Sequence, residues 1–511
     1  MSLAAPSACD RESARHLLQR ATWGPRSGEI DELCRLGPRR WIERQFLMGL
    51  RAGPSAPRLP AEMERRLEDH RSHGLDPTRL REAFPPGDVL RARGGELSPT
   101  ERRLLGPQRL QQEVAVRRLV HAAHAADQLR DRLTAFWSDH FNVSLRKGPN
   151  RWLVGDFEAT AIRPHVLGSF PAMLRAVAMH PAMLVFLDNV QNVAAAPFPA
   201  RQPGTVRGGA RRTVVAPDDP DSDSRPRAGN ENFARELLEL HTLGLDGGYT
   251  ERDVEEVARV FTGWGIAQGD SLSFAFRPRL HDSRPKRVLG IELGAGRGMD
   301  EGEEVLALLA EHPSTARHLA GKLVRYFVNE AGDGAMESDL AATFLEGGGD
   351  LLAVSRALFE HPRFGSPENR SAVFRTPFEY AVAALRAVGG ELTGPGGFSP
   401  PILTFLRSSG SLPWHEDSPA GVSRGVHAWS GGAHLLERLA FAESLAGGRV
   451  QGVSLPRSVS RRGAVGGPFF RLEEVLELVH PGGVPPTLAE SLRDPVRLVT
   501  LGLGGPAFQW M

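Results

Sequence analysis

The stretch 230–264 constrains the fold of this chain more than any other. Its apolar residues recur every three or four positions, and its acidic residues fall between them, on the other side of a helix. Asn230 can cap the beginning of such a helix and Gly244 can end it. The sequence therefore predicts an amphipathic helix over 231–243, with one buried face and one face crowded with carboxylates.

A second helix is predicted directly after this one. Thr250 and Asp253 have the spacing of a capping box, in which each side chain accepts a hydrogen bond from the other residue's backbone N–H. The residues that would form its buried stripe are Val254, Val257, Ala258 and Phe261. Two consecutive amphipathic helices of this kind indicate a helical core.

The polar face of the first helix supplies the candidate catalytic residues. Glu236 and Glu239 lie three positions apart and project together, next to Asn232 and Arg235. A carboxylate at the border of an apolar stripe needs a partner, because an unpaired buried charge costs several kcal/mol. The partner is either a metal ion or a cation such as arginine or protonated histidine. In the alternative, these residues form a structural ion-pair network, in which Arg235 binds a neighbouring carboxylate.

Further candidate metal ligands lie elsewhere in the chain. His140 falls on an apolar face with Phe136 and Trp137, and its partner is either a metal or a backbone carbonyl. We add Asp188, His281 and Asp282 as candidate ligands, with Glu236 and Glu239, since mixed histidine and carboxylate sets bind divalent metals. His281-Asp282 is equally suited to a turn. No His-Glu-x-x-His pattern and no cysteine pair with zinc spacing occurs.

The same stretch resembles a known family. The run from Asn230 to Leu240 and the run from Tyr249 to Trp264 are similar to the signature of the bacterial family called domain of unknown function 1800. Other similar blocks follow the family's order: His16–Pro25, Phe136–Phe141, Leu187–Asn189, His281-Asp282, His312–Leu323 and Pro506–Phe508. The resemblance covers nearly the whole chain and implies one family-wide helical fold, but no reaction.

Charge and hydropathy limit the classes of partner. The 62 Lys plus Arg and 61 Asp plus Glu residues give a formal net charge of +1, which offers no general attraction to nucleic acid. Only Lys147, Lys286 and Lys322 are lysines, which we interpret as a base-composition bias. No apolar run is long enough for a membrane span and no signal peptide is present, so we expect a cytoplasmic location. Family resemblance suggests export as the alternative, from an upstream start.

The predicted fold class is mainly α, a multi-helix body with one small β-hairpin near 272–291 and long Pro/Gly-rich loops. In that hairpin, residues 273–276 would pair with 287–291. We divide the single body of 1–511 into sub-regions: N-terminal helices (1–50), helical core (98–193), a disordered insertion (194–229), further helical core with the hairpin (230–390) and a loop-rich helical part (391–511). The insertion is either a lid or an unselected surface loop.

One apparent catalytic motif is rejected. Gly421-Val-Ser423-Arg-Gly425 has the spacing of a nucleophile elbow, but that motif requires a strand before it and a helix after it. The surrounding proline and glycine residues predict a loop instead.

Two functions follow from these patterns. The first is an enzyme whose carboxylate and histidine cluster, with a divalent metal as its candidate cofactor, performs hydrolytic or oxidative chemistry on a small molecule. The alternative is a non-catalytic scaffold or binding partner of another protein, in which the polar cluster is an ion-pair network.

Overall fold

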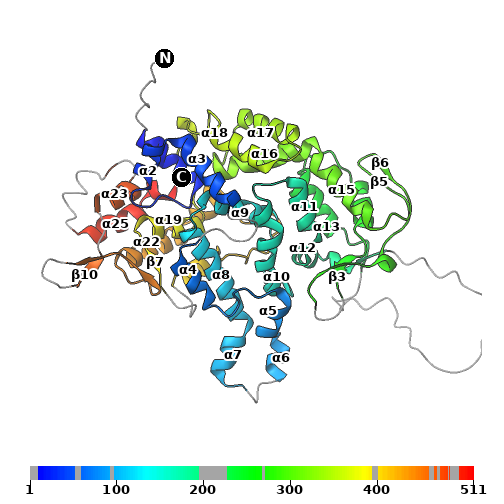
Figure 1. Ribbon diagram of the computed structural model, residues 1–511, viewed down its shortest axis with the longest axis horizontal. Coiled ribbons are helices and arrows are strands. Elements are labelled where there is room, and N and C mark those ends of the chain that lie inside the picture. The colour runs from blue at the N-terminus through cyan, green and yellow to red at the C-terminus, as the bar shows by residue number, and fades with distance from the viewer. Residues whose placement is uncertain are drawn as a thin grey trace, which may run out of the picture.

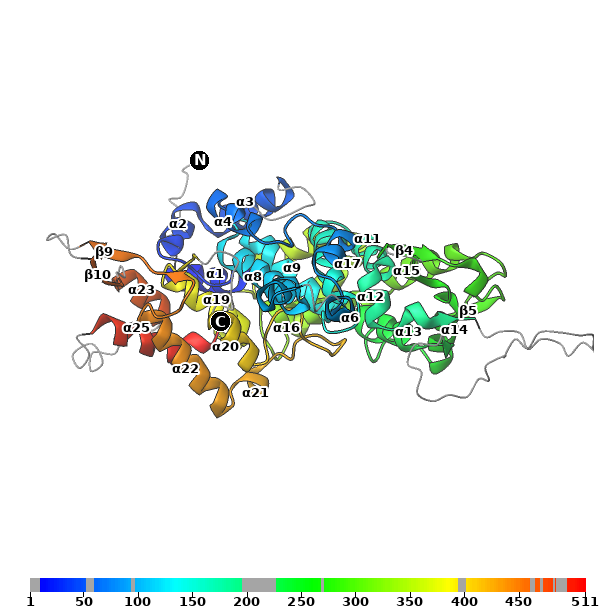
Figure 2. The ribbon, with the colours of Figure 1, turned by 90° about the horizontal axis from the view of Figure 1, so that it is seen from below.

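The computed structural model describes residues 10–51, 59–92, 97–194, 227–267, 271–393, 401–459, 465–468, 472–480, 483 and 494–511. This part of the chain is mainly helical, as predicted, with only short two-stranded sheets. Figures 1 and 2 show an elongated body with the helices of residues 107–156 in its middle. None of the described helices combines the length and the hydropathy needed to cross a membrane.

Two consecutive helices lie in the middle of the molecule, α8 (Pro107–His124) and α9 (Gln128–His140). Almost every residue of α9 is buried, including its charged residues Arg130, Asp131 and Arg132. The helix packs against α1 (Arg11–Ala21), α3 (Pro38–Arg51), α8 and the π-helical turn η1 (Phe157–Ile162). Charges on so buried a helix must be satisfied from its neighbours.

The two ends of the chain meet at one end of the body. In Figure 1 the blue N-terminal helices lie beside the red C-terminal ones. Arg11 on α1 pairs with Glu477 on α23 (Leu472–Val479), with 2.8 Å between Nη2 and Oε1. α23 packs against α25 (Pro495–Gly504), and α25 also packs against α26 (Pro506–Gln509) and α22 (Gly432–Ala446).

The helices predicted from residues 230–264 lie at the opposite end. The first is confirmed, but only α13 (Asn232–Glu236) is regular, because it continues as the π-helical turn η4 (Leu237–Thr242). Gly244, at φ +83°, follows it in the left-handed conformation that glycine favours. The second, α14 (Glu251–Val260), has the predicted capping box, and its four stripe residues are buried.

The predicted pairing of 273–276 with 287–291 is wrong. Strand β4 (Phe274–Phe276) pairs antiparallel with β3 (Trp264–Ile266), and β5 (Lys286–Val288) pairs with β6 (Ile291–Leu293) across a tight turn. Leu289 and Gly290 form that turn with φ of +49° and +82°, the geometry that joins adjacent strands in a two-residue hairpin. The remaining pairs are β1 (Asn192–Val193) with β2 (Arg227–Ala228), which is parallel, β7 (Glu391–Leu392) with β8 (Val453–Ser454), and β9 (Arg457–Val459) with β10 (Val465–Pro468).

The rest of the described chain is also largely helical. The break at His180-Pro181 separates α11 (Phe170–Met179) from α12 (Pro181–Phe186). A capping box of Thr376 and Glu379 begins α19 (Pro377–Ala387). The remaining helices are α2 (Glu29–Leu36), α4 (Ala61–Glu68), α5 (Pro77–Ala83), α6 (Gly87–Ala92), α7 (Pro99–Leu105), α10 (Asn150–Asp156), α15 (Met299–Glu311), α16 (Pro313–Phe327), α17 (Gly334–Glu346), α18 (Leu351–Glu360), α20 (Pro401–Ser408) and α21 (Val426–Trp429). Most of the insertion predicted at 194–229 lies outside the described residues.

Candidate functional site

Two adjoining cavities lie between α9, α16 and the loop of residues 409–425. The Trp23 cavity, of about 120 Å³, has an aromatic wall that includes Trp23, Tyr326, Phe378 and Trp414. The Lys322 cavity, of about 620 Å³, is lined by Lys322, His140 and residues of the same loop. Both cavities are lined by Asp139, Tyr326, Glu416, Val422 and Arg424, so the two spaces share a wall. Concave spaces with apolar walls and a few polar groups are typical of ligand sites.

Asp139, near the end of α9, lies between the two cavities. Its Oδ1 accepts a hydrogen bond from the backbone N–H of Val422 at 2.6 Å, and it forms no ion pair with any described residue. Burial raises the pKa of Asp139 to about 6, although the Val422 N–H and the cations Arg424 and Lys322 act in the opposite direction. A carboxyl group with this pKa can both accept and release a proton near neutral pH.

Lys322 extends into the same space from α16. It too has no ion pair among the described residues. Burial lowers the pKa of Lys322 to about 8, and the nearby charge of Asp139 opposes that shift. Asp139 and Lys322 therefore carry opposite charges at pH 7 and interact electrostatically. Both line the Lys322 cavity, where a bound molecule could contact them.

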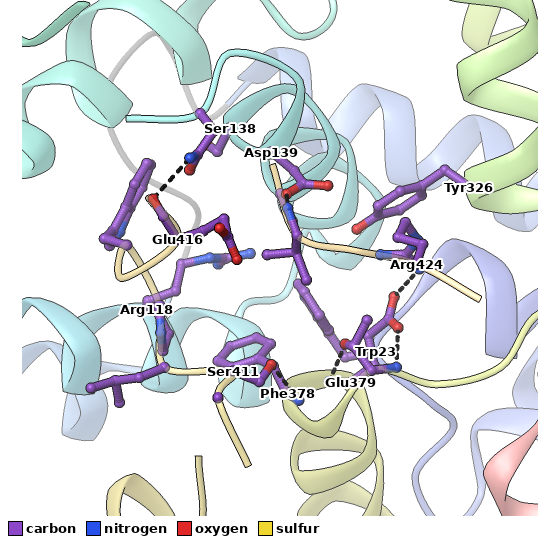
Figure 3. A pocket seen from close by; sticks show the side chains of 18 residues that line it. Trp23, Arg118, Ser138, Asp139, Tyr326, Phe378, Glu379, Ser411, Glu416 and Arg424 are labelled. Atoms are coloured by element: carbon purple, nitrogen blue, oxygen red, sulfur yellow. Dashed lines mark hydrogen bonds and ion pairs between the residues drawn. The ribbon is translucent and has the colours of Figure 1, made fainter. Parts of the chain in front are cut away.

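A buried network of ion pairs lies in the wall of the Trp23 cavity. Glu379, the third residue of α19, accepts from Arg132 and from Arg424, each at 2.8 Å. Figure 3 shows the pair of Glu379 and Arg424 beside Trp23 and Tyr326. The guanidinium carbon of Arg424 lies 3.9 Å from the centroid of the Tyr326 ring, and Arg132 stacks on Trp23 at 4.6 Å. Although burial acts to raise the pKa of Glu379, the two arginines hold it well below its usual range.

A second network lies on the other side of Trp23. Asp131 accepts from Arg118 at 2.9 Å and from the indole Nε1 of Trp23 at 2.8 Å. Arg163 lies 3.4 Å from the same carboxylate and also pairs with Glu158. Burial alone would raise the pKa of Asp131, but Arg118 and Arg163 lower it to about 2. Asp131 thus has cationic partners, whereas Asp139, the other carboxylate of α9, has no ion pair with a described residue.

The Nε2 atom of His140 has a hydrogen-bond partner in the protein, so it does not require a metal ion. This atom lies 3.2 Å from the carbonyl oxygen of His241, and Nε2 of His318 lies 3.0 Å from the carbonyl oxygen of Leu240. Both carbonyls belong to the end of η4, where helix carbonyls lack partners within the helix. Burial, together with Lys322 and the neighbouring histidines, holds the pKa of His140 well below its ordinary value. His140 is therefore a neutral imidazole in the wall of the Lys322 cavity.

The other candidate ligands lie apart from these cavities. Asp188, at φ +58°, pairs with Lys147 at 2.8 Å. His281 is buried, with Nδ1 2.9 Å from the carbonyl oxygen of Thr262 and Nε2 3.4 Å from Oε1 of Glu301. Asp282 is also buried and pairs with Arg259 and Arg284. His281-Asp282 lies between a 3₁₀ turn (Pro278–Leu280) and β5.

Glu236 and Glu239 are half-buried, and neither forms an ion pair with a described residue. Burial raises the pKa of Glu236, and the charge of Glu239 adds to the shift. Arg235 turns away to pair with Glu251 at 2.7 Å and with Glu231 at 3.3 Å, and Asn232 is exposed. The role of this carboxylate face remains a prediction.

Across the residues that the structure describes, no three His, Cys, Asp or Glu side chains gather in a way that could hold a metal ion. The sequence analysis did not select Asp139, Lys322 or Arg424, which are brought together by α9, α16 and the 409–425 loop. One sequence signal could have pointed to Lys322. Of 62 basic residues only three are lysines, and Lys147 and Lys286 both pair with carboxylates, at 2.8 and 2.6 Å. Lys322 alone of the three has no such partner.

A family model described as "Protein of unknown function (DUF1800)" matches residues 16–509. No curated protein and no solved structure matches the chain.

Proposed function

Since this chain belongs to the DUF1800 family, whose description names no reaction, we propose from the site itself that it is a hydrolase of carboxylic esters. In this proposal Asp139 is the general base and Lys322 stabilises the negative charge that develops on the carbonyl oxygen. One observation carries the proposal: two opposite charges line one cavity, and neither is neutralised by an ion pair with a described residue.

The reaction balances with water as the only co-reactant. Asp139 takes a proton from a water molecule, and the water oxygen forms a bond to the carbonyl carbon. The carbonyl π electrons move to the oxygen, where the Lys322 ammonium group stabilises the negative charge. The carbonyl then re-forms, the bond to the alkoxide breaks, and the alkoxide takes the proton from Asp139. Acid and alcohol leave, and both side chains regain their starting charges.

The surroundings support this division of roles. The pKa of Asp139 near 6 leaves most of it ionised at pH 7, and the pKa of Lys322 near 8 leaves most of it protonated. The Trp23 cavity offers an apolar surface for the acyl or alkyl part of an ester. Because Glu379 already binds Arg132 and Arg424, its carboxylate does not compete with Asp139 for the proton.

The test is release of nitrophenolate from p-nitrophenyl esters of short carboxylic acids. Asp139→Asn keeps the acceptor for the Val422 N–H and removes the base, so kcat should fall by about 10²-fold or more. Asp156→Asn is the matched control: Asp156 is half-buried near the end of its helix and pairs with His180 at 3.0 Å. Equal rates in both variants would reject the proposal. Absence of hydrolysis over a broad ester panel would favour the scaffold alternative.

A second candidate site is the Glu236–Glu239 face, where one observation favours a bound cation. Both carboxylates are half-buried and form no ion pair with a described residue, and burial raises the pKa of Glu236. A divalent metal bound at this face would support the metal-dependent enzyme that the sequence predicted. The metal content of the purified protein tests whether such a metal is bound.

A further inference from the structure

A third cavity adjoins the Trp23 cavity and shares no lining residue with the Lys322 cavity. The Arg117 cavity, of about 300 Å³, is lined by residues of α8 and η1 and by Trp414. It shares Arg118 and Trp414 with the Trp23 cavity, so the three spaces follow one another through the molecule. Trp414 itself has φ +64°, a conformation that is rare for a bulky residue and that is concentrated at functional sites.

The charges in the wall of the Arg117 cavity do not balance. Arg117, Arg118, Arg163 and Glu158 line the cavity, and the buried Asp131 pairs with Arg118 and Arg163. Arg118 and Arg163 are paired with Asp131 and Glu158, so two cations meet two carboxylates. This pairing leaves the positive charge of Arg117 without a carboxylate of its own in the cavity wall. Among the described residues, its only polar contact is from Nη2 to the carbonyl oxygen of Ser72, at 3.4 Å, and it forms no ion pair.

Neighbouring groups do not supply the missing negative charge. Glu113, one turn earlier on α8, has its own cation, Arg109, at 2.7 Å. His121, which also lines the cavity, is neutral, because burial and Arg163 lower its pKa to about 3. Arg118 is 7% exposed, and its Nη2 has no acceptor among the described residues. The wall thus offers one uncompensated positive charge and an unused guanidinium donor, next to the apolar surfaces of Val114, Ala159 and Trp414.

We propose that the Arg117 cavity binds the carboxylate of an aliphatic acid, held between Arg117 and Arg118, with its apolar chain directed along Trp414 toward the Trp23 cavity. One net positive charge matches a monoanion better than a phosphate dianion. That this carboxylate belongs to the substrate, an ester with an acid group at its far end, rests on the hydrolytic function proposed above. The proposal that this cavity binds a carboxylate does not depend on the hydrolytic function.

The experiment is isothermal titration calorimetry of the full chain with hexanoate, hexan-1-ol and hexyl phosphate. Hexanoate should bind once per chain, and hexan-1-ol should bind at least about tenfold more weakly, because the charge-assisted hydrogen bonds are lost. Tighter binding of hexyl phosphate would overturn the assignment to a carboxylate. Equal binding of hexanoate and hexan-1-ol would overturn the anion site.

Variants locate the site without disturbing the buried pair of Arg118 and Asp131. Arg117→Gln should weaken hexanoate binding about tenfold or more, whereas Arg117→Lys, which keeps the charge, should retain most of it. Arg175→Gln is the control, since Arg175 is half exposed and pairs with Glu303 on the surface. Unchanged hexanoate affinity in Arg117→Gln would refute the proposal. Because binding is measured without turnover, hexanoate binding through Arg117 in a protein that hydrolyses no ester would reject the hydrolase and keep the anion site.

Discussion

The backbone of Gly421 passes directly over Asp139. A Cβ atom placed on Gly421 would lie 2.7 Å from Oδ1 of Asp139 and closer still to the Asp139 carbonyl oxygen. Gly421 also has φ +83°, which side chains other than glycine rarely adopt. The next residue, Val422, donates its N–H to the same carboxylate. The loop that carries the rejected nucleophile-elbow pattern thus positions the proposed base, and the pattern's glycine has a steric role.

Gly421→Ala should therefore damage both stability and activity. The left-handed backbone and the close contact together should cost about 2–4 kcal/mol of unfolding free energy, and ester hydrolysis should fall as the loop moves from Asp139. Gly28→Ala is the control, because Gly28 has a similar φ of +82° and a Cβ there would meet nothing within 4 Å. It should lose only about 1 kcal/mol and keep its activity. Equal losses in the two variants would show that the contact with Asp139 is unimportant.

Removing the charge of Asp139 should stabilise the protein at alkaline pH. The pKa of this carboxyl rises from 3.8 to about 6 on folding, so its contribution to stability is present below pH 3.8 and is lost as the pH rises through 6. Asp139→Asn cannot ionise and avoids that loss. We expect the variant to gain about 1–3 kcal/mol over the parent at pH 8 relative to their difference at pH 3.5. A difference in denaturant midpoints that does not change with pH would contradict the raised pKa.

The fold was largely predictable because its helices are marked locally. The capping boxes at Thr250 and Thr376 and the proline that begins α12 each depend on residues within one turn. The strand pairing was not predictable in the same way. Residues 274–276 can pair with any nearby strand of suitable length, and their partner β3 is only three residues long and follows a helix directly.

The site was harder to predict because its members are distant in sequence. Asp139 looks like any acidic residue of an amphipathic helix until α16 places Lys322 beside it and the 409–425 loop covers it. His140 was selected for its apolar surroundings. In the structure His140 lies in the wall of the Lys322 cavity, and its Nε2 forms a hydrogen bond with the carbonyl oxygen of His241. That contact depends on the π-helical turn η4. A π-helical turn has no marked signal in the sequence.

Glu236→Gln tests the second candidate site. If a divalent cation binds between Glu236 and Glu239, the variant should purify with less metal, and added Mg²⁺ or Mn²⁺ should raise its melting temperature less than that of the parent. Without such a cation, the substitution removes the repulsion between the two carboxylates, and the variant should become slightly more stable. Equal metal content and equal response to added metal would exclude the cation site.

Arg235 should prove to be a surface residue with a minor structural role. Its side chain is 36% exposed, and its partner Glu251 is 75% exposed, so the pair is well screened by solvent. Arg235→Ala should lower the unfolding free energy by less than about 1 kcal/mol and leave ester hydrolysis unchanged. An unchanged melting temperature combined with lost hydrolysis would move Arg235 into a functional site.

The dependence of kcat/KM on pH tests the central claim most directly. Hydrolysis requires ionised Asp139 and protonated Lys322, so kcat/KM should rise as the pH passes about 6 and fall as it passes about 8. In Lys322→Arg the cation stays charged at high pH, so the alkaline limb should disappear while the acid limb remains. If parent and Lys322→Arg show the same alkaline limb, Lys322 is not the group that must be protonated, and the Asp139–Lys322 mechanism is wrong.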